Sequence, residues 1–425
     1  MSPLRRRALL SALSIALFTA PLFSQTPPKA EPPSRESGFK KQIASAWEQL
    51  ATWCVKWKFR AEARAAADEA LALDAGNAKA KSARDWADKE GPETNESLRK
   101  DYEKKLDATK KQAAGLWQQI AQDPVVAKDA AAGDAAWERA LQLDPKAIQP
   151  LHEAEIRAAM QKQDWKRAAR LLAQEEAALG SDAARAKTMR EVEAKSSVTD
   201  PLLKKASTHE LRYFLSLPPG WTPDKTWPVL VVCEGAGGNY RDQCARFASY
   251  RKDVPVIVMA PCTFTNSGGP RKDKHPWYSA EVIAEWTNKN TMDFDEAGML
   301  AGLADLRRDY NAEEKFFIAG YSGGGILTWW TIFRRPAELR GAFPACANYG
   351  GSPATPPEDG RDLVVRAFQG DKDGHLEMLT ESWKRAEEQL KKWEYTDFSR
   401  TLLPGVGHTA CHEPIYKAIQ EILKK

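Results

Sequence analysis

Ser322 lies in a short glycine-rich turn whose composition suggests nucleophilic chemistry. The turn reads Gly320-Tyr321-Ser322-Gly323-Gly324-Gly325; it follows the apolar run 316–319, a predicted strand, and precedes a predicted helix that begins at Ile326. A sharp turn from strand to helix leaves no room for bulk beside the serine, and the flanking glycines meet that need. The turn would lift Oγ above the sheet and place a helix N-terminus beneath it, where developing negative charge is favoured. Ser322 is therefore predicted to be a nucleophile.

A serine hydroxyl is a weak nucleophile at neutral pH and needs an adjacent base. The chain has six histidines, of which three follow Ser322: His375, His408 and His412. His408 ends the segment 401–408, where a final predicted strand runs into a glycine-rich loop that can fold over the nucleophile. His375 is interpreted as a loop residue and His412 as the start of the last helix. We therefore predict His408 as the general base.

Two aspartates follow the predicted strand 363–368, within Gly370-Asp371-Lys372-Asp373-Gly374. A carboxylate at this strand end could hold the tautomer of the His408 imidazole and stabilise its charged form. An aspartate beside glycine is also a common turn former, and that interpretation must apply to at least one of the two. From the residues alone, Asp371 and Asp373 both remain candidates.

From about residue 208 to 425 the chain resembles the α/β-hydrolases. Among them it looks most like the secreted esterase group that includes polyhydroxybutyrate depolymerase-like and feruloyl esterase-like enzymes. The resemblance rests on motifs that occur in the expected order: Leu215-Ser216-Leu217-Pro218-Pro219-Gly220-Trp221, Trp227-Pro228-Val229, the glycine loop 234–239, the turn at Ser322, Gly370-x-x-Asp373 and Gly407-His408. It implies hydrolysis of carboxylic esters through an acyl-enzyme, with no metal and no cofactor.

The resemblance also implies roles for individual residues. In the family the acid and base follow the serine in chain order, and the acid usually lies three residues after the glycine, which selects Asp373 over Asp371. The oxyanion hole would be formed by the backbone N–H groups of Gly323 and, from the loop 234–239, Ala236. Family members usually carry a histidine where this chain has Glu234, so the local geometry of that loop can differ.

The substrate-binding residues are less well defined. Only about fifteen residues (348–362) separate the sixth predicted strand from the seventh, so the usual lid is absent and the site should be open to bulky or polymer-linked esters. The segment 261–290 is long and aromatic, and its Trp277 and Tyr278, together with Tyr321 of the turn, are candidate substrate-binding residues. An equally good interpretation is that the aromatic residues of this segment pack the loop onto the protein.

The elements that must position these side chains alternate between strands and helices from about Asp200. Apolar runs at 209–217, 229–233, 254–260, 316–319, 341–347, 363–368 and 401–403 are separated by helix-like segments at 240–252, 295–310, 323–335, 376–394 and 413–424. This alternation predicts a doubly wound, mostly parallel sheet in a catalytic domain over 200–425. Each candidate site residue follows a strand, at the edge where such sheets bind ligands.

Residues 39–195 are rich in alanine and charge, with apolar residues at three- and four-residue spacing, which predicts an all-α domain. The pattern Trp47, Leu50, Ala51 and Ala70-Leu71 recurs seventy positions later at Trp117, Ile120, Ala121 and Ala140-Leu141. It resembles stacked tetratricopeptide (TPR) helix pairs, with a degenerate copy at 78–111 and a further pair at 148–180. This TPR-like domain could dock a protein partner or a substrate, or could serve only as a spacer.

The N-terminus predicts export. Arg5, Arg6 and Arg7 precede the apolar stretch 8–23, which indicates a signal peptide over 1–24, followed by a Pro-rich linker over 25–38. An uncleaved anchor helix is the alternative, but the stretch is short and interrupted by polar residues. No later stretch is apolar enough to span a bilayer, so the cleaved protein is expected to be secreted or periplasmic, without stable membrane insertion.

Composition sets the remaining limits. A length of 425 residues suggests two domains, and 43% hydrophobic residues suffice for packed cores. The net charge of +4 is spread over 62 basic and 58 acidic residues, which gives no argument for nucleic-acid binding. Six cysteines are too few for a disulfide scaffold, although one or two bridges are possible. Cys233 and Cys346 are interpreted as buried free thiols.

Three functions are compatible with these patterns. An exported serine esterase is the leading hypothesis. A serine peptidase of prolyl-oligopeptidase type is the second, although a helical array stands where that class carries a β-propeller. The third is an interaction protein whose helical domain binds a partner while the hydrolase domain is inactive, a view favoured only by Glu234.

Overall fold

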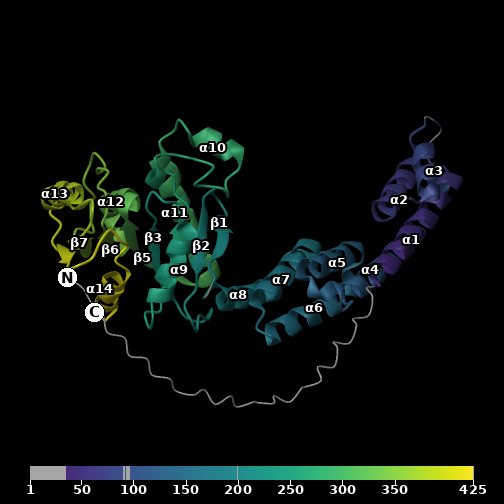
Figure 1. Cartoon of the computed structure of the whole chain (residues 1–425), viewed down its shortest axis with the longest axis horizontal. Coiled ribbons are helices and arrows are strands. Elements are labelled where there is room, and N and C mark those ends of the chain that lie inside the picture. Colours follow the sequence, from purple (N-terminus) through teal and green to yellow (C-terminus); the bar gives the residue numbers. More distant parts are fainter. Residues whose placement is uncertain (1–34, 90, 92–95, 199, 425) are drawn as a thin grey trace, which may run out of the picture.

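The computed structural model describes residues 35–89, 91, 96–198 and 200–424. The predicted signal peptide (1–24) and most of the predicted linker (25–38) lie outside these residues; the first helix already begins at Glu36, inside the predicted linker. The described chain forms an elongated molecule with a helical region at one end and a sheet flanked by helices at the other (Figure 1). Two separate hydrophobic cores correspond to these parts.

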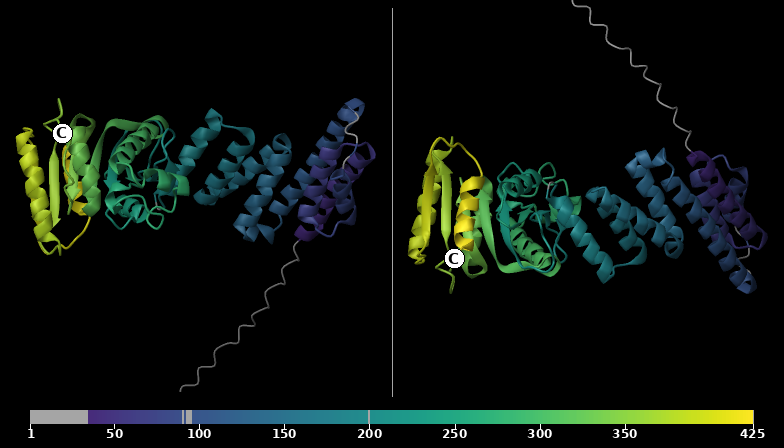
Figure 2. Two further views of the ribbon diagram at one scale, coloured as in Figure 1. Left: turned by 90° about the horizontal axis from the view of Figure 1, so that it is seen from above. Right: turned by 90° about the horizontal axis from the view of Figure 1, so that it is seen from below.

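The helical region consists of antiparallel helices that pack in consecutive pairs, as further views show (Figure 2). Alanine-rich amphipathic faces bury small side chains between the helices, and Asp129, Asp144 and Asp164 cap the N-termini of three of them. The helices are α1 (Glu36–Lys56), α2 (Arg60–Leu73), α3 (Ala78–Ala87), α4 (Arg99–Ala121), α5 (Ala130–Leu143), α6 (Pro145–Gln161), α7 (Trp165–Leu179) and α8 (Ala183–Ser197), with short 3-10 turns η1 (Glu96–Leu98) and η2 (Val126–Lys128).

The pairing of these helices differs from the predicted repeat in one place. The helix pair expected at 148–180 is present as α6 and α7, and the pairs α1–α2 and α4–α5 also form. The segment 78–111, predicted as a degenerate helix pair, instead divides between two neighbours: α3 packs mainly on α2 and α1, whereas α4 packs on α1 and α5. α3 has 10 residues and α4 has 23, so the two helices are also unequal in length, unlike the helices of a regular repeat.

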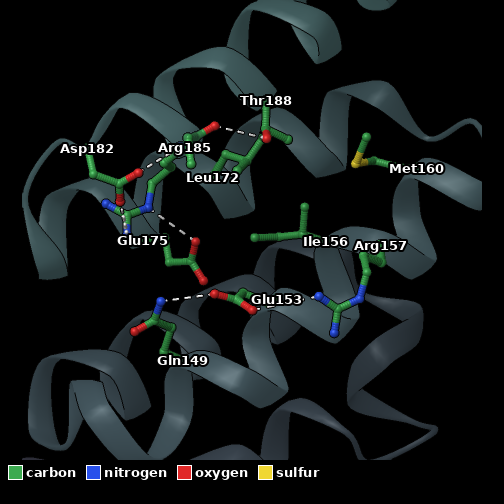
Figure 3. Close-up of a pocket in the computed structure, with 11 residues that line it drawn as sticks. Gln149, Glu153, Ile156, Arg157, Met160, Leu172, Glu175, Asp182, Arg185 and Thr188 are labelled. Carbon is green, nitrogen blue, oxygen red and sulfur yellow. Dashed lines mark hydrogen bonds and ion pairs between the residues drawn. The ribbon is translucent and has the colours of Figure 1, made fainter.

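A pocket of about 360 Å³ lies in the helical region, between α6, α7 and α8. Figure 3 shows its lining, in which Glu175 and Arg185 face Ile156 and Glu153 across the space. The Glu175 carboxylate is buried: one of its oxygens pairs with Arg185 at 3.3 Å, while the other lies 3.5 Å from His152 Nδ1 without a hydrogen bond. The pocket therefore combines apolar walls with charged groups that are largely paired with each other.

The second part of the molecule is built on one sheet of eight strands in the order β1-β2-β4-β3-β5-β6-β7-β8. Strands β3 to β8 run parallel to one another, and at one edge β2 pairs antiparallel with both β4 and β1. The strands are β1 (Leu202–Lys205), β2 (Arg212–Ser216), β3 (Trp227–Cys233), β4 (Ile257–Pro261), β5 (Ala312–Tyr321), β6 (Leu339–Ala345), β7 (Val365–Gly370) and β8 (Phe398–Leu403). The central strands β3, β4 and most of β5 are fully buried, as expected for near-continuous apolar runs covered on both faces.

Helices cover both faces of this sheet. Gly302 of α11 sits so close to Met259 that a Cβ there would lie 2.4 Å from the Met259 Cε, whereas Gly341 faces Ile422 of α14 from the opposite side of the pleat. The helices of this part are α9 (Tyr240–Tyr250), α10 (Ala280–Trp286), α11 (Thr291–Tyr310), α12 (Gly325–Arg334), α13 (Leu376–Lys392) and α14 (His412–Leu423), with 3-10 turns η3 (Thr265–Ser267), η4 (Ser322–Gly324) and η5 (Pro336–Glu338). The chain thus has an α/β-hydrolase fold preceded by an all-α region, as predicted.

The two parts are joined through α8 rather than through a free linker. Its last turn packs on the sheet: Ser216 Oγ donates to Ser197 O at 2.8 Å, and the Leu217 N–H donates to Ser197 Oγ at 3.0 Å. Glu193 accepts from the Tyr310 hydroxyl at 2.6 Å, and Ala194 belongs to the hydrophobic core of the sheet. The end of α8 is therefore part of the packing of the sheet region, and the predicted end of the helical domain at residue 195 falls inside this helix. None of the helices in the described ranges is both long and apolar enough to cross a bilayer.

Candidate active site

Ser322 occupies a constrained turn between β5 and α12. β5 ends at Tyr321, η4 begins at Ser322 itself, and the Ser322 φ of 51° lies in the left-handed region that residues with a Cβ rarely adopt. The neighbouring glycines allow this close packing. A Cβ on Gly324 would lie 2.2 Å from the Cys233 carbonyl oxygen of β3, and one on Gly320 would lie 2.0 Å from the Thr328 Oγ1. The predicted strand, turn and helix are confirmed, and the surrounding backbone holds Ser322 in its strained conformation.

Asp373 and His408 meet at the ends of β7 and β8. The His408 Nδ1 lies 2.8 Å from the Asp373 Oδ2, and the other carboxylate oxygen accepts from the His375 backbone N–H at 2.8 Å. Burial acts to raise the pKa of Asp373, but hydrogen bonds from the His375 N–H, His408 and the Cys346 thiol hold that pKa below its ordinary value. Asp373 is therefore a carboxylate placed to accept from the His408 Nδ1–H, and the tautomer selected by that bond offers Nε2 as a proton acceptor.

The competing residues have other roles. Asp371 Oδ1 accepts a hydrogen bond from the Gly405 N–H at 2.7 Å, so this carboxylate closes the loop after β8. His412 begins α14 and packs on Phe247 and Tyr250; burial, with the charge of Arg246, lowers the pKa of His412 to about 4. The structure thus pairs His408 with Asp373 and not with Asp371.

Tyr321 directly precedes Ser322 in the chain and contacts His408. Its ring centroid is 5.0 Å from that of His408, and its hydroxyl donates to the His408 carbonyl oxygen at 3.4 Å. Within the described residues, the hydrogen bond of the His408 imidazole is with Asp373, and none joins it to the Ser322 Oγ. Bonds of this kind are often long without substrate and tighten in the reacting complex. Tyr321, a predicted substrate-binding residue, stands beside both groups.

The loop 234–239 lies directly against the turn that carries Ser322. A Cβ on Gly235 would lie 3.2 Å from the Ser322 Cβ, and one on Gly323 would lie 3.3 Å from the backbone nitrogen of Ala236. The two predicted oxyanion-hole donors, the N–H groups of Gly323 and Ala236, are therefore neighbours beside the serine. Glu234 is buried and folds back on its own loop; burial raises the pKa of this carboxyl although the N–H groups of Gly235 and Asn239 bind it.

Asn266 holds this loop in place and was missed by sequence reasoning. Its side-chain amide donates to the carbonyl oxygens of Glu234 and Gly235, both at 2.9 Å, and its Oδ1 accepts from the Tyr240 hydroxyl at 3.0 Å. Asn266 is buried within η3, far from the loop in sequence. A lone asparagine in a long loop gives no sequence signal, because the contact exists only in the folded chain.

Cys346 is a second residue of the site that the sequence did not assign to it. It is a buried free thiol, as predicted, but it lies just beyond the end of β6, with a φ of 44°. Its sulfur has several polar partners: the Cys411 thiol, the backbone N–H groups of Gly370 and Thr409, and the Asp373 carboxyl. The bond from Cys411 is foremost in lowering the pKa of Cys346 to about 7, in spite of burial. All six cysteines are free.

The aromatic residues predicted to bind substrate divide between the two interpretations. Tyr278 is only 2% exposed, and its hydroxyl donates to the Cys262 carbonyl oxygen at 2.7 Å. The Trp277 ring packs edge-on against Phe214 and Tyr240. Tyr278 is therefore a core residue, as the packing interpretation expects, whereas Trp277 is only partly buried against the core and its role as a substrate contact stays a prediction. Burial of an aromatic ring removes a large apolar surface from water, and this packing stabilises the fold.

Comparisons with known proteins add the following. No protein-family model and no curated protein matches this chain. Among solved structures, a thermostable esterase is 21% identical, with 54% of this chain and 64% of the other covered and a TM-score of 0.38. A phospholipase/carboxylesterase from Dyadobacter fermentans is 20% identical (52% and 97% covered, TM-score 0.37), and the Bacillus cereus carboxylesterase is 18% identical (50% and 94% covered, TM-score 0.37). This chain thus spans less than two thirds of the length of the first of these structures.

Proposed function

We propose that this protein is a serine hydrolase of carboxylic esters in which Ser322 is the nucleophile, His408 the general base and Asp373 the acid that orients it. The observation that carries this proposal is the 2.8 Å contact between His408 Nδ1 and Asp373 Oδ2, at the edge of the sheet where the strained turn presents Ser322. A nucleophile, a base and an orienting carboxylate are the minimal set for acyl transfer through serine.

The reaction would proceed in two halves. Nε2 of His408 takes the proton of Ser322 Oγ as the oxygen attacks the ester carbonyl, and the N–H groups of Gly323 and Ala236 stabilise the oxyanion. The imidazolium, held by Asp373, then gives its proton to the departing alcohol and leaves an acyl-enzyme. Water activated by the same imidazole hydrolyses this intermediate and restores the serine.

The substrate is proposed to be a bulky or polymer-linked ester. Support comes from the connection between β6 and β7, which carries no helix within the described residues 346–364 and so adds no lid over the strand ends. With Tyr278 buried in the core, the partly buried Tyr321 and Trp277 remain as the proposed aromatic contacts for the acyl or alcohol group.

We further propose that the protein is exported and that residues 39–195 act as a TPR-like docking domain. The predicted signal peptide supports export. The stacked pairs α1–α2, α4–α5 and α6–α7, and the pocket between α6, α7 and α8, support docking. In this arrangement the helices hold a partner or a polymer while the sheet domain cleaves esters.

Turnover of short p-nitrophenyl esters by the mature chain and by Ser322→Ala tests the proposal. The substitution should lower kcat by more than about 10⁴-fold because no other group can form the acyl-enzyme. A fluorophosphonate probe should label the parent chain once and leave Ser322→Ala unlabelled. Ester hydrolysis that survives in Ser322→Ala would refute the assignment, and cleavage of peptides without ester turnover would favour a peptidase.

A further inference from the structure

Three side chains beside the Ser322 turn form a cluster of metal-ligand type. The ligand atoms are the sulfur of Cys346, a carboxylate oxygen of Asp373 and a ring nitrogen of His408. All three atoms lie within 4.8 Å of one another. The chain brings them together from the ends of β6, β7 and β8, three neighbouring parallel strands. The Asp373 side chain is fully buried, whereas 25% of the His408 side chain is exposed, so the cluster is open to solvent through the imidazole.

We propose that this cluster binds a thiophilic divalent cation, Zn²⁺ or Cd²⁺, and that the bound ion switches off the hydrolase. Binding requires only the cluster; the switching rests on the function proposed above. One thiolate, one imidazole and one carboxylate, with a fourth position for water, form the three-protein-ligand arrangement that zinc accepts readily, whereas Mg²⁺ and Ca²⁺ prefer oxygen ligands alone.

The geometry requires little rearrangement. Around a tetrahedral zinc ion with bonds of about 2.0–2.3 Å, neighbouring ligand atoms are separated by roughly 3.5 Å. The present separations bracket that value, from the 2.8 Å between His408 and Asp373 to the limit of 4.8 Å for the whole cluster. Rotation of the His408 and Cys346 side chains by small amounts would therefore complete the site.

The charges also balance. Binding replaces the proton of the Cys346 thiol by the metal and releases that proton to solvent, while Asp373 binds as a carboxylate and His408 as a neutral imidazole. A divalent ion with one thiolate and one carboxylate leaves no net charge in a largely buried site. The backbone N–H groups of Gly370 and Thr409 already point at the Cys346 sulfur and would support it as a thiolate.

The bound ion would block catalysis because it uses the same atoms. Coordination takes the Asp373 oxygen and the His408 nitrogen out of the contact that orients the base. The imidazole of His408 would then no longer be held in the tautomer that accepts the proton of Ser322. Loss of activity and loss of this contact are thus the same event.

Direct binding is the first test. The mature chain is reduced, freed of metal with a chelator, and titrated with Cd²⁺ while thiolate-to-metal charge-transfer absorption is followed. One equivalent should bind and Zn²⁺ should displace it. Cys346→Ser, which keeps a hydroxyl near Asp373, should weaken binding by at least about 100-fold. Cys54→Ala, which removes a buried thiol from α1 in the other domain, should bind like the parent chain.

His408→Asn provides a second ligand variant should Cys346→Ser fold poorly, and it should also weaken Cd²⁺ binding. Equal affinity in the parent chain and both ligand variants, or no stoichiometric binding to the reduced parent chain, would overturn the proposal. These outcomes do not depend on any esterase activity.

Inhibition is the second test. One equivalent of Zn²⁺ should reduce p-nitrophenyl ester turnover at least tenfold, a chelator should restore it, and Mg²⁺ should have no effect. The residual turnover of Cys346→Ser should resist the same Zn²⁺ concentration. Stoichiometric binding with unchanged turnover would refute the switch. If the parent chain binds Cd²⁺ but hydrolyses no ester, the proposed function is refuted and the proposed metal site is still supported.

Discussion

The aspartates at 371 and 373 are two positions apart, yet only one of them contacts the base. Asp373→Asn should lower kcat by about 10³–10⁴-fold, because an amide beside Nδ1 favours the wrong imidazole tautomer and cannot stabilise the imidazolium. Asp371→Asn should change kcat by less than about threefold, because an amide oxygen can still accept from the Gly405 N–H. Steady-state ester kinetics of the two variants decide this, and a larger loss in Asp371→Asn would reverse the assignment.

Residues of the site differ in how far the sequence could reveal them. Ser322 and His408 could be predicted because their signals are local: glycines packed around a serine, and a histidine in a loop after a strand. Asp373 could be preferred only by resemblance, since Asp371 has the same neighbours. Asn266 and Cys346 could not be found, because their partners lie far away in the chain, about 30 residues for Asn266 and up to 65 for Cys346 (411 − 346), and are brought near only by the fold.

At the scale of elements, alanine substitutions at two glycines should change the stability of the fold in opposite directions. Gly115 lies inside α4 with no atom within 4 Å of its would-be Cβ, so Gly115→Ala should stabilise the fold by about 0.5–1 kcal/mol through helix propensity. Gly324→Ala should destabilise it and lower ester turnover, because the new methyl group would lie 2.2 Å and 2.5 Å from the carbonyl oxygens of Cys233 and Glu234. Thermal unfolding measures both, and a neutral Gly324→Ala would contradict the close packing described here.

The elements that the sequence predicted best are those with strong burial. The central strands are continuous apolar runs, so the sequence pattern predicts both that they are strands and where in the chain each one lies. β1 was missed because Leu202–Lys205 is a short edge strand of two leucines and two lysines that buries no residue fully, and α10 was missed because it also buries none. The pair expected at 78–111 failed for a related reason: repeat spacing does not determine which neighbour a short helix such as α3 packs against.

For the whole molecule, the position of α8 decides where the chain can be divided. A fragment of residues 182–425 keeps α8 with its Asp182 cap, whereas 200–425 removes the partners of Ser216, Leu217 and Tyr310. The shorter fragment should be less stable by about 3 kcal/mol or more, since buried polar groups lose their hydrogen bonds. Its thermal midpoint should be lower by on the order of 5–10 °C. Equal midpoints in calorimetry would show that α8 contributes nothing to the sheet domain.

The same helix has a geometric consequence. The first turn of α8 supplies Asp182 and Arg185 to the pocket of the helical region, and its last turn is fixed to β2 and α11. One continuous helix therefore connects the pocket to the sheet region that carries Ser322, and the distance between the two is set by that helix and not by a flexible linker. A polymer bound to the helical region would reach Ser322 at a constant distance from its bound segment. Its cleavage products would therefore share a common length.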